Sequence, residues 1–373
     1  MTTKLNIGII DSDQQQRRIF NYPNLSLMKI SGYHKSKGDT VSLISYDDVT
    51  GLFRNSYDKI YLSKVFTKPE LPPIIANDDS IIKGGTGLFF DKSPRLTEEI
   101  EHHMPDYYLY ENIYSNINPT KLKYFTDFSI GFYTKGCIRQ CSFCVNKNSK
   151  EVRRHHNLVD FIDNNRPYLM LWDDNVLAYR NFNNAIAELN DYGKPFVFKQ
   201  GMDFRLLTPE KMKLLFNSNY YSSNNSKGTR IFHFSFDNIK DYNLMQKKLK
   251  YHYENVKKYS YKTFFYVLTG YDFNGKYDNS FFKNDIISLM ERIKLLFKYN
   301  AYPYIMEHEN LSKNPNVKAI NKLRILCNTP MLITNKTLRE AAEQSRFLNM
   351  INFFDKIDKS FLDIKFNSLL YKN

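Results

Sequence analysis

Short apolar runs alternate with helix-like stretches over the first 100 residues of the chain. Four runs have the length and composition of buried strands: 5–10, 40–46, 59–66 and 80–85. Between the first two runs, apolar residues recur at roughly helical spacing: Leu25, Leu27, Met28, Ile30 and Tyr33. This order of strand, helix and strand predicts an open, mostly parallel sheet across residues 1–100.

The fourth run ends in the glycine-rich segment 84–87. Backbone amides of such a segment are able to surround a phosphate. The segment lacks the GxGxxG and GxxxxGK[ST] patterns of phosphate-binding loops, and no clear helical pattern follows it. It therefore predicts a tight turn at the end of a strand.

Six further runs, rich in apolar, β-branched and aromatic residues, follow from residue 128 onward: 128–133, 168–172, 196–199, 231–236, 263–268 and 302–306. Helix-like stretches lie between them at 182–193, 208–218 and 285–300. Repeated β/α units of about 30 residues predict a parallel barrel of the TIM type. Because six units fall short of the usual eight, we expect a partial, open (β/α)6 barrel.

These patterns predict an α/β protein in three parts. Residues 1–118 form a small Rossmann-like domain with a parallel sheet, followed by a linker. The linker belongs to a stretch at 101–127 that looks irregular. Residues 119–334 form the partial barrel. Residues 335–373 look helical and form a C-terminal extension that packs as a lid or cap.

The composition is that of a folded protein, because 42% of the 373 residues are apolar and the chain carries 28 Tyr and 29 Phe. No run of 18 apolar residues is present, so we expect no membrane span, no secretion and a cytoplasmic location. The net charge of +14 favours nucleic acid, phosphorylated ligands or an acidic protein partner. The alternative explanation of the charge is that a low-GC genome produces many lysines without selection for any partner.

Three of the four cysteines, Cys137, Cys141 and Cys144, fall within eight residues, and Cys327 is remote. Such a cluster is unlike a disulfide framework and indicates a metal site in a reducing compartment. Three thiolates on one loop ligate three irons of a [4Fe-4S] cluster and leave the fourth iron without a protein ligand. This pattern makes an iron–sulfur site the first interpretation.

A zinc site is the alternative, built from the same three cysteines with Cys327, His155 or His156. Zinc usually takes Cys-x2-Cys pairs separated by a longer loop, which the spacing here does not provide. We expect Cys327 to be a small buried apolar residue and the two histidines to lie on a solvated loop.

The segment TKGCIRQCSFC at 134–144 resembles the signature of the radical S-adenosylmethionine superfamily, CxxxCxφC, with Phe143 as the aromatic residue φ. In that superfamily the loop follows the first strand of a partial (β/α)6 barrel, where the periodicity also predicts a strand. The resemblance implies two cofactors, a [4Fe-4S] cluster and S-adenosylmethionine, whose methionyl amino and carboxylate groups chelate the open iron. One electron then splits the sulfonium, and the resulting 5′-deoxyadenosyl radical abstracts hydrogen from a substrate.

The resemblance also implies cofactor-binding positions after the barrel strands. The superfamily holds the methionyl ammonium with a Gly-Gly-Glu-like segment after the second strand. Asp173 and Asp174 take that place here, and a carboxylate facing an ammonium provides the same interaction. Which of the two aspartates would do so stays open.

Gln200, Asp203 and Arg205 follow the third barrel strand. We expect them to contact the cofactor carboxylate or the substrate, with Arg205 as the candidate for an anionic group. A salt bridge between Asp203 and Arg205 is the structural alternative.

The later strands provide three more cofactor candidates. Ser235 and Asp237 follow the fourth strand, where ribose hydroxyls are held, and Gly270 matches the glycine that lets the backbone approach adenine. Each has an alternative role as a helix cap or turn residue. Glu307 and His308, after the sixth strand, are candidate substrate contacts.

The N-terminal part resembles the cobalamin-binding-like domain that precedes the barrel in several radical S-adenosylmethionine families, without the DxHxxG motif that binds cobalamin. The whole chain most resembles uncharacterised members of the superfamily from bacteria and phages. The resemblance implies a radical enzyme that receives an electron from flavodoxin or ferredoxin and acts on an unidentified substrate, RNA or another macromolecule. The alternative is an iron–sulfur module that binds nucleic acid or senses redox state without radical turnover.

Overall fold

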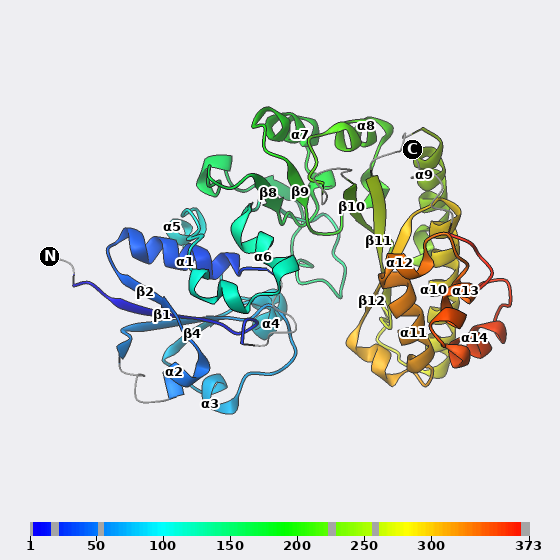
Figure 1. Ribbon diagram of the computed structural model, residues 1–373, viewed down its shortest axis with the longest axis horizontal. Helices are drawn as coiled ribbons and strands as arrows, with labels where there is room; N and C mark the ends of the chain where they lie inside the picture. Colours follow the sequence, from blue (N-terminus) through cyan, green and yellow to red (C-terminus); the bar gives the residue numbers. More distant parts are fainter. Residues whose placement is uncertain (1–2, 16–21, 51–55, 223–228, 256–260, 367–373) are drawn as a thin grey trace. The chain divides into compact units, whose positions relative to one another are not determined.

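The computed structural model describes residues 3–15, 22–50, 56–222, 229–255 and 261–366 (Figure 1). The chain is a mixed α/β protein with parallel sheets, as the sequence predicted. It divides into two compact units, Met1–Trp172 and Asp173–Asn373, and each is described by itself. The domain boundaries expected after residues 118 and 334 remain predictions.

The first unit contains a four-stranded parallel sheet in the order β2-β1-β3-β4. Its strands are the four predicted ones: β1 (Asn6–Asp11), β2 (Thr40–Leu43), β3 (Lys59–Ser63) and β4 (Ile81–Gly84). In the register, Ile9 of β1 lies opposite Leu43 of β2 and Tyr61 of β3. The parallel sheet expected over residues 1–100 is therefore confirmed.

Helices cover both faces of this sheet. Ile7 and Ile9 face α1 (Leu25–Ser36) and pack with its Leu27 and Met28. The opposite face packs with α2 (Tyr46–Thr50) and α3 (Pro73–Ala76). Figure 1 shows α1 on one side of the sheet and α2 and α3 on the other. The helix α1 begins where the Asn24 side chain accepts a hydrogen bond from the Leu27 amide, at 3.3 Å.

The stretch 101–127 is not the irregular linker that the sequence suggested. The stretch begins at the last residue of α5 (Glu98–Glu101). It then contains a 3-10 helix, Glu111–Asn116, and the helix α6 (Pro119–Thr126). The α6 start signal is an Asn118 cap followed by proline at the first helical position. The glycine-rich turn leads into another short helix, α4 (Thr86–Phe89).

The remaining strands of the first unit carry the cysteine region. β5 (Phe128–Gly131) pairs in parallel with β8 (Tyr168–Leu171). β6 (Thr134–Gly136) pairs antiparallel with β7 (Val152–Arg154), so the residues between them form a hairpin loop.

In the second unit, β10 (Arg230–Ser235), β11 (Tyr261–Thr269) and β12 (Tyr302–Glu307) form a parallel sheet. β9 (Phe196–Phe198) precedes them, and a parallel bridge joins Met202 to Phe234 of β10. The intervening helices are α7 (Phe182–Asp191), α8 (Pro209–Asn217), α9 (Tyr242–Asn255) and α10 (Asn279–Lys298).

The second unit continues after β12 with the helices α11 (Val317–Asn328) and α12 (Pro330–Ile333). Within the predicted extension, α13 (Leu338–Gln344) and α14 (Leu348–Asp355) are helical, and residues 356–366 form no helix. The last residues of the predicted extension, 367–373, lie outside the described residues.

All six strands expected from residue 128 onward are present. In the described parts of the chain they do not join into one hydrogen-bonded barrel sheet. None of the described helices is both long and apolar enough to cross a membrane.

Candidate functional site

The cysteine loop, residues 137–151, is held at its base by the β6–β7 ladder. Thr134 pairs with Arg154, and Gly136 pairs with Val152. Gly136 has φ 104°, and a Cβ at this position would lie 2.1 Å from the carbonyl oxygen of Glu151. Only glycine fits this close approach of the two strands, so the glycine directly before Cys137 has a structural reason.

Hydrogen bonds inside the loop fix its two ends. The Cys137 amide donates to Ser149 Oγ at 3.1 Å, and Ser149 Oγ donates to the Glu151 carbonyl at 3.1 Å. The Cys144 amide donates to the Cys141 carbonyl at 2.9 Å and closes a turn between the two cysteines. The loop is therefore an ordered structure.

The three loop cysteines are half-buried and form no disulfide. The Arg139 amide donates to Cys137 Sγ at 3.3 Å, and the Asn146 amide donates to Cys144 Sγ at 3.4 Å. Amide donors to sulfur are one means by which proteins tune iron–sulfur clusters. Three cysteine sulfurs, two of them with such donors, are ligands of the type that a [4Fe-4S] cluster takes.

Basic residues are frequent in the sequence of the loop and its two strands. Between residues 134 and 154 the single acidic residue is Glu151, and the basic residues are Lys135, Arg139, Lys147, Lys150, Arg153 and Arg154. Three of these basic side chains are paired with carboxylates: Lys135 with Glu101, Lys147 with Asp91 and Arg153 with Glu151.

Phe143, the aromatic residue of the signature, is half-buried in this loop. Cys327 is fully buried in α11, as predicted for a small apolar residue, and burial raises the pKa of its thiol far above the ordinary value. It lies in the second unit, whereas the three loop cysteines lie in the first.

The two histidines after β7 do not lie on a solvated loop, so that expectation was wrong. His156 is 1% exposed, and the side chain of His155 is 19% exposed. The His155 amide donates to the Tyr133 carbonyl at 3.0 Å, and His156 Nδ1 lies 3.0 Å from the Phe132 carbonyl. These contacts turn the chain inward directly after the hairpin.

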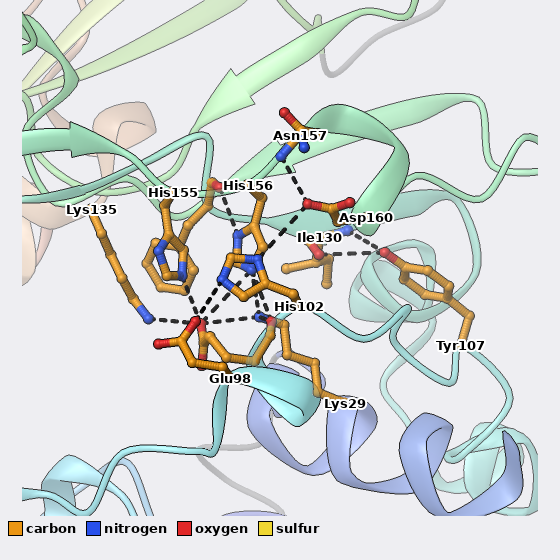
Figure 2. A network of polar contacts seen from close by, with 12 residues as sticks. Lys29, Glu98, His102, Tyr107, Ile130, Lys135, His155, His156, Asn157 and Asp160 are labelled. Atoms are coloured by element: carbon orange, nitrogen blue, oxygen red, sulfur yellow. Dashed lines mark hydrogen bonds and ion pairs between the residues drawn. The ribbon is translucent and has the colours of Figure 1, made fainter. Parts of the chain in front are cut away.

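Both histidines meet Glu101 of α5. Among the described residues, Glu101, His155 and His156 form the one group of three candidate metal ligands whose donor atoms lie within 4.8 Å of one another. Figure 2 shows Lys29, Lys135, His155 and His156 gathered around one place. Glu101 Oε1 lies within hydrogen-bond distance of Lys29, Lys135 and His155. We call these five residues the Glu101 cluster.

The charges within the Glu101 cluster shift several pKa values. Burial raises the pKa of Glu101, but the hydrogen bond from His155 and the charges of Lys29 and Lys135 outweigh it, and the net pKa is far below the ordinary value. Burial lowers the pKa of Lys29 to about 8, against the attraction of Glu101. Burial and the Lys29 charge lower the pKa of His156 to about 4, so its imidazole is neutral at pH 7.

Arg205 forms the salt bridge that the sequence left as an alternative. Its Nε lies 2.7 Å from Asp203 Oδ1, its Nη2 lies 3.1 Å from Asp203 Oδ2, and its Nη1 lies 2.8 Å from Asp241 Oδ2. Burial lowers the pKa of the guanidinium, but the two aspartates raise it by more than burial lowers it. The net pKa is therefore above the ordinary value, and the guanidinium stays charged. Asp203 is itself buried, and its amide donates to Asn175 Oδ1 at 3.4 Å.

The other cofactor candidates lie in the second unit at strand ends. Asp173 is buried and Asp174 half-buried after β8, while Gln200 is exposed after β9. Ser235 is the last residue of β10, and Asp237 accepts from the Leu268 amide at 3.2 Å. Burial raises the pKa of Asp237 to about 6, although the charge of Arg292 lowers it.

Gly270 has φ 80°, and a Cβ there would lie 2.7 Å from Leu311 Cβ. A glycine is therefore required at the end of β11 by the packing of the second unit itself. Glu307, the last residue of β12, pairs with Arg324 at 3.3 Å, and His308 directly after it accepts at Nδ1 from the Asn310 amide at 3.3 Å. His308 thus acts as a cap of the 3-10 helix Glu309–Lys313.

The comparisons with known proteins found no match for this chain among protein-family models, curated proteins or solved structures. The three loop cysteines lie on one hairpin loop, and the other cofactor candidates from Asp173 onward lie in the second unit. Among the described residues the three sulfurs are not within 4.8 Å of one another. The Glu101 cluster is the feature that sequence reasoning missed. Its one available signal was the pair His155–His156 directly after the cysteine loop, which does not reveal a partner 54 positions earlier.

Proposed function

We propose that the cysteine loop holds a [4Fe-4S] cluster through Cys137, Cys141 and Cys144, and that the protein is a radical S-adenosylmethionine enzyme. The supporting observation is an ordered hairpin loop with three thiols outside disulfides, two of which accept backbone amide hydrogen bonds. When bound, such a cluster supplies one electron at an iron that has no protein ligand. The proposed outcome is reductive cleavage of S-adenosylmethionine and hydrogen abstraction from an unidentified substrate, RNA or another macromolecule.

Residues within the loop hold its shape and donate hydrogen bonds to its sulfurs. The Arg139 and Asn146 amides stabilise negative charge on two sulfurs. The Ser149 hydroxyl bonds the Cys137 amide at the start of the loop and the Glu151 carbonyl at its end, and so connects the two ends. Thiolate ligands need reduced cysteines, so the proposal includes a cytoplasmic location.

The fold part of the proposal is a partial (β/α)6 barrel preceded by a Rossmann-like domain. It is supported by six strands in the expected order and by parallel pairing of consecutive strands β10, β11 and β12. Residues at the strand ends then have proposed roles in binding S-adenosylmethionine: Asp173 or Asp174 for the ammonium, Ser235 and Asp237 for the ribose, and Gly270 beside adenine. Gln200 and Arg205 are proposed to contact the cofactor carboxylate or the substrate. Arg205 is the candidate for an anionic group, and its guanidinium is held by Asp203 and Asp241.

The proposed electron donor is a flavodoxin or a ferredoxin. Six basic residues and one acidic residue lie between positions 134 and 154, on and beside the loop that would receive the electron. A positive surface attracts an acidic carrier and speeds its association.

The test is anaerobic reconstitution with iron and sulfide, followed by dithionite, S-adenosylmethionine and chromatography for 5′-deoxyadenosine. We expect a cluster and product formation in the wild type, and neither in Cys141→Ala. Cys327→Ala is the matched control, because this cysteine is buried in α11 and outside the loop, and it should retain the cluster. Zinc in place of iron and sulfide in anaerobically purified protein would refute the proposal.

The second candidate is an iron–sulfur module that binds nucleic acid or senses redox state. The same basic surface supports it, since phosphate contacts dominate nucleic-acid affinity. It predicts two results. The protein would hold a cluster but form no 5′-deoxyadenosine even when RNA is present, and it would bind RNA with an affinity that depends on salt.

A further inference from the structure

The Glu101 cluster connects the two ends of the cysteine loop. Lys135 is two residues before Cys137, and His155 directly follows the last residue of β7. Glu101 Oε1 accepts from Lys135 Nζ at 2.9 Å and from His155 Nε2 at 2.7 Å. One carboxylate oxygen therefore bonds a residue of β6, the strand that enters the loop, and the residue directly after β7, the strand that leaves it.

The donor atoms in this cluster suit an ammonium better than a metal ion. A carboxylate and two imidazoles are ligands that zinc takes. The Lys29 ammonium, however, already lies 3.1 Å from Glu101 Oε1, 3.0 Å from His156 Nε2 and 2.5 Å from the Glu101 carbonyl. Two oxygens of Glu101 therefore accept from this ammonium, whose N–H groups are donors only. A divalent cation among these atoms would also face the charges of Lys29 and Lys135.

His156 also lies against Lys29. Its Nδ1 lies 3.0 Å from the Phe132 carbonyl, and its Nε2 lies 2.9 Å from the Glu101 carbonyl and 3.0 Å from Lys29 Nζ. His156 thus fastens the chain after β7 to the buried lysine of α1.

The cluster is anchored in the sheet of the first unit. Lys29 is 2% exposed and belongs to α1, whose Leu27 and Met28 pack on Ile7 and Ile9 of β1. The Glu101 amide donates to the Thr97 carbonyl at 2.8 Å at the end of α5. The loop ends are therefore tied to a packed helix and sheet by way of one carboxylate.

We propose that Glu101 is a positioning residue that holds the two ends of the cysteine loop in register, so that the three thiols form a prearranged ligand set. This inference rests on the proposed role of the loop as a cluster site. Removing the negative charge leaves Lys29 buried without its anionic partner and releases Lys135. The loop ends then lose their shared acceptor, and the loop becomes free to open locally.

The first test needs no cluster. Hydrogen exchange is measured on the apoprotein of the wild type, Glu101→Gln and Glu98→Gln. Glu98 lies on the same helix with its side chain 93% exposed, so Glu98→Gln is the matched control. We expect exchange in peptides covering residues 134–156 to accelerate about tenfold in Glu101→Gln, the effect of one lost charged hydrogen bond. Exchange in β1 and β3 should stay unchanged in both variants.

The second test follows iron in the reconstituted protein. Glu101→Gln should release iron to a ferrous chelator about tenfold faster than the wild type, and Glu98→Gln at the wild-type rate. Lys135→Met alone should accelerate release, and the double variant Glu101→Gln/Lys135→Met should add little, since both changes remove one contact. A merely structural role would lower the unfolding midpoint without this coupling.

The outcomes separate this inference from the proposed function. If no variant takes up iron but exchange accelerates around the loop in Glu101→Gln, the cluster proposal fails and the positioning role stands. If the wild type binds iron and Glu101→Gln changes neither exchange nor iron release, the positioning role is overturned. One zinc per chain that survives replacement of the three loop cysteines but is lost in His156→Ala overturns it as well.

Discussion

The Tyr110 hydroxyl donates a 2.6 Å hydrogen bond to Asp11 Oδ2, and both side chains are buried in the first unit. Asp11 is the last residue of β1, and its Oδ1 also accepts from the Asp13 amide at 3.1 Å. Burial raises the pKa of Asp11 to about 7, although the bond from Tyr110 lowers it. Strand β1 therefore ends in a buried carboxyl group that is bonded to a tyrosine hydroxyl.

The first prediction concerns the pH dependence of stability. The folded pKa of Asp11, about 7, lies above the unfolded value of 3.8, so the folded state binds the proton more tightly. This contribution is fully present below the unfolded pKa and is lost as pH rises through about 7. Asp11→Asn should therefore show a smaller fall in the free energy of unfolding between pH 5 and pH 8 than the wild type.

Denaturant unfolding at several pH values between 5 and 8 measures this difference. Asp79→Asn is the control, because this aspartate is exposed, and its curve should run parallel to that of the wild type. Parallel curves for Asp11→Asn and the wild type would show that Asp11 titrates alike in both states.

The second prediction separates the two roles considered for Arg205. Because its guanidinium contacts Asp203 and Asp241 at 2.7 to 2.8 Å, Arg205→Ala should lower the free energy of unfolding by about 1–3 kcal/mol. Arg205→Lys should not restore it, since lysine lacks the two-pronged donor geometry. The exposed Arg180 provides the control Arg180→Ala. Unchanged stability in Arg205→Ala, together with lost S-adenosylmethionine binding, would instead assign the guanidinium to a ligand.

The third prediction tests the packing at Gly270. Gly270→Ala places a Cβ 2.7 Å from Leu311 Cβ in a backbone with φ 80°. Gly193→Ala has a similar φ of 86° and no atom within 4 Å of the new Cβ, so it isolates the backbone term. We expect about 1–2 kcal/mol of destabilisation in Gly193→Ala and about 1–3 kcal/mol more in Gly270→Ala. Equal effects in thermal or denaturant unfolding would show that Leu311 moves aside freely.

The fourth prediction concerns thiol reactivity in the apoprotein. The three loop cysteines are half-buried, whereas Cys327 is fully buried and burial raises the pKa of its thiol. Iodoacetamide should label the loop thiols in the folded protein and Cys327 only after unfolding, because the thiolate is the reactive species. Mass spectrometry of the labelled peptides measures this, and labelling of Cys327 without denaturant would contradict its packing.

Local patterns predicted much of the fold. The Thr208-Pro209 start signal matches α8, where the Thr208 side chain accepts from the Lys211 amide at 3.2 Å. The four N-terminal strands and the six later ones also lie where apolar runs were found. The start of α6 at Asn118-Pro119 was equally local and was overlooked. These elements are predictable because caps and apolar periodicity act over a few neighbouring residues.

Spacing over short stretches predicts the parallel α/β character of the chain and places three thiols on one loop. The contact of buried His156 with Lys29, which lies 127 positions earlier, is visible in the folded chain alone. The same is true of Arg205, which bonds Asp241, 36 positions away, as well as its neighbour Asp203. Such pairs depend on how helices pack on sheets, and that packing is set by burial over the whole unit rather than by any local pattern.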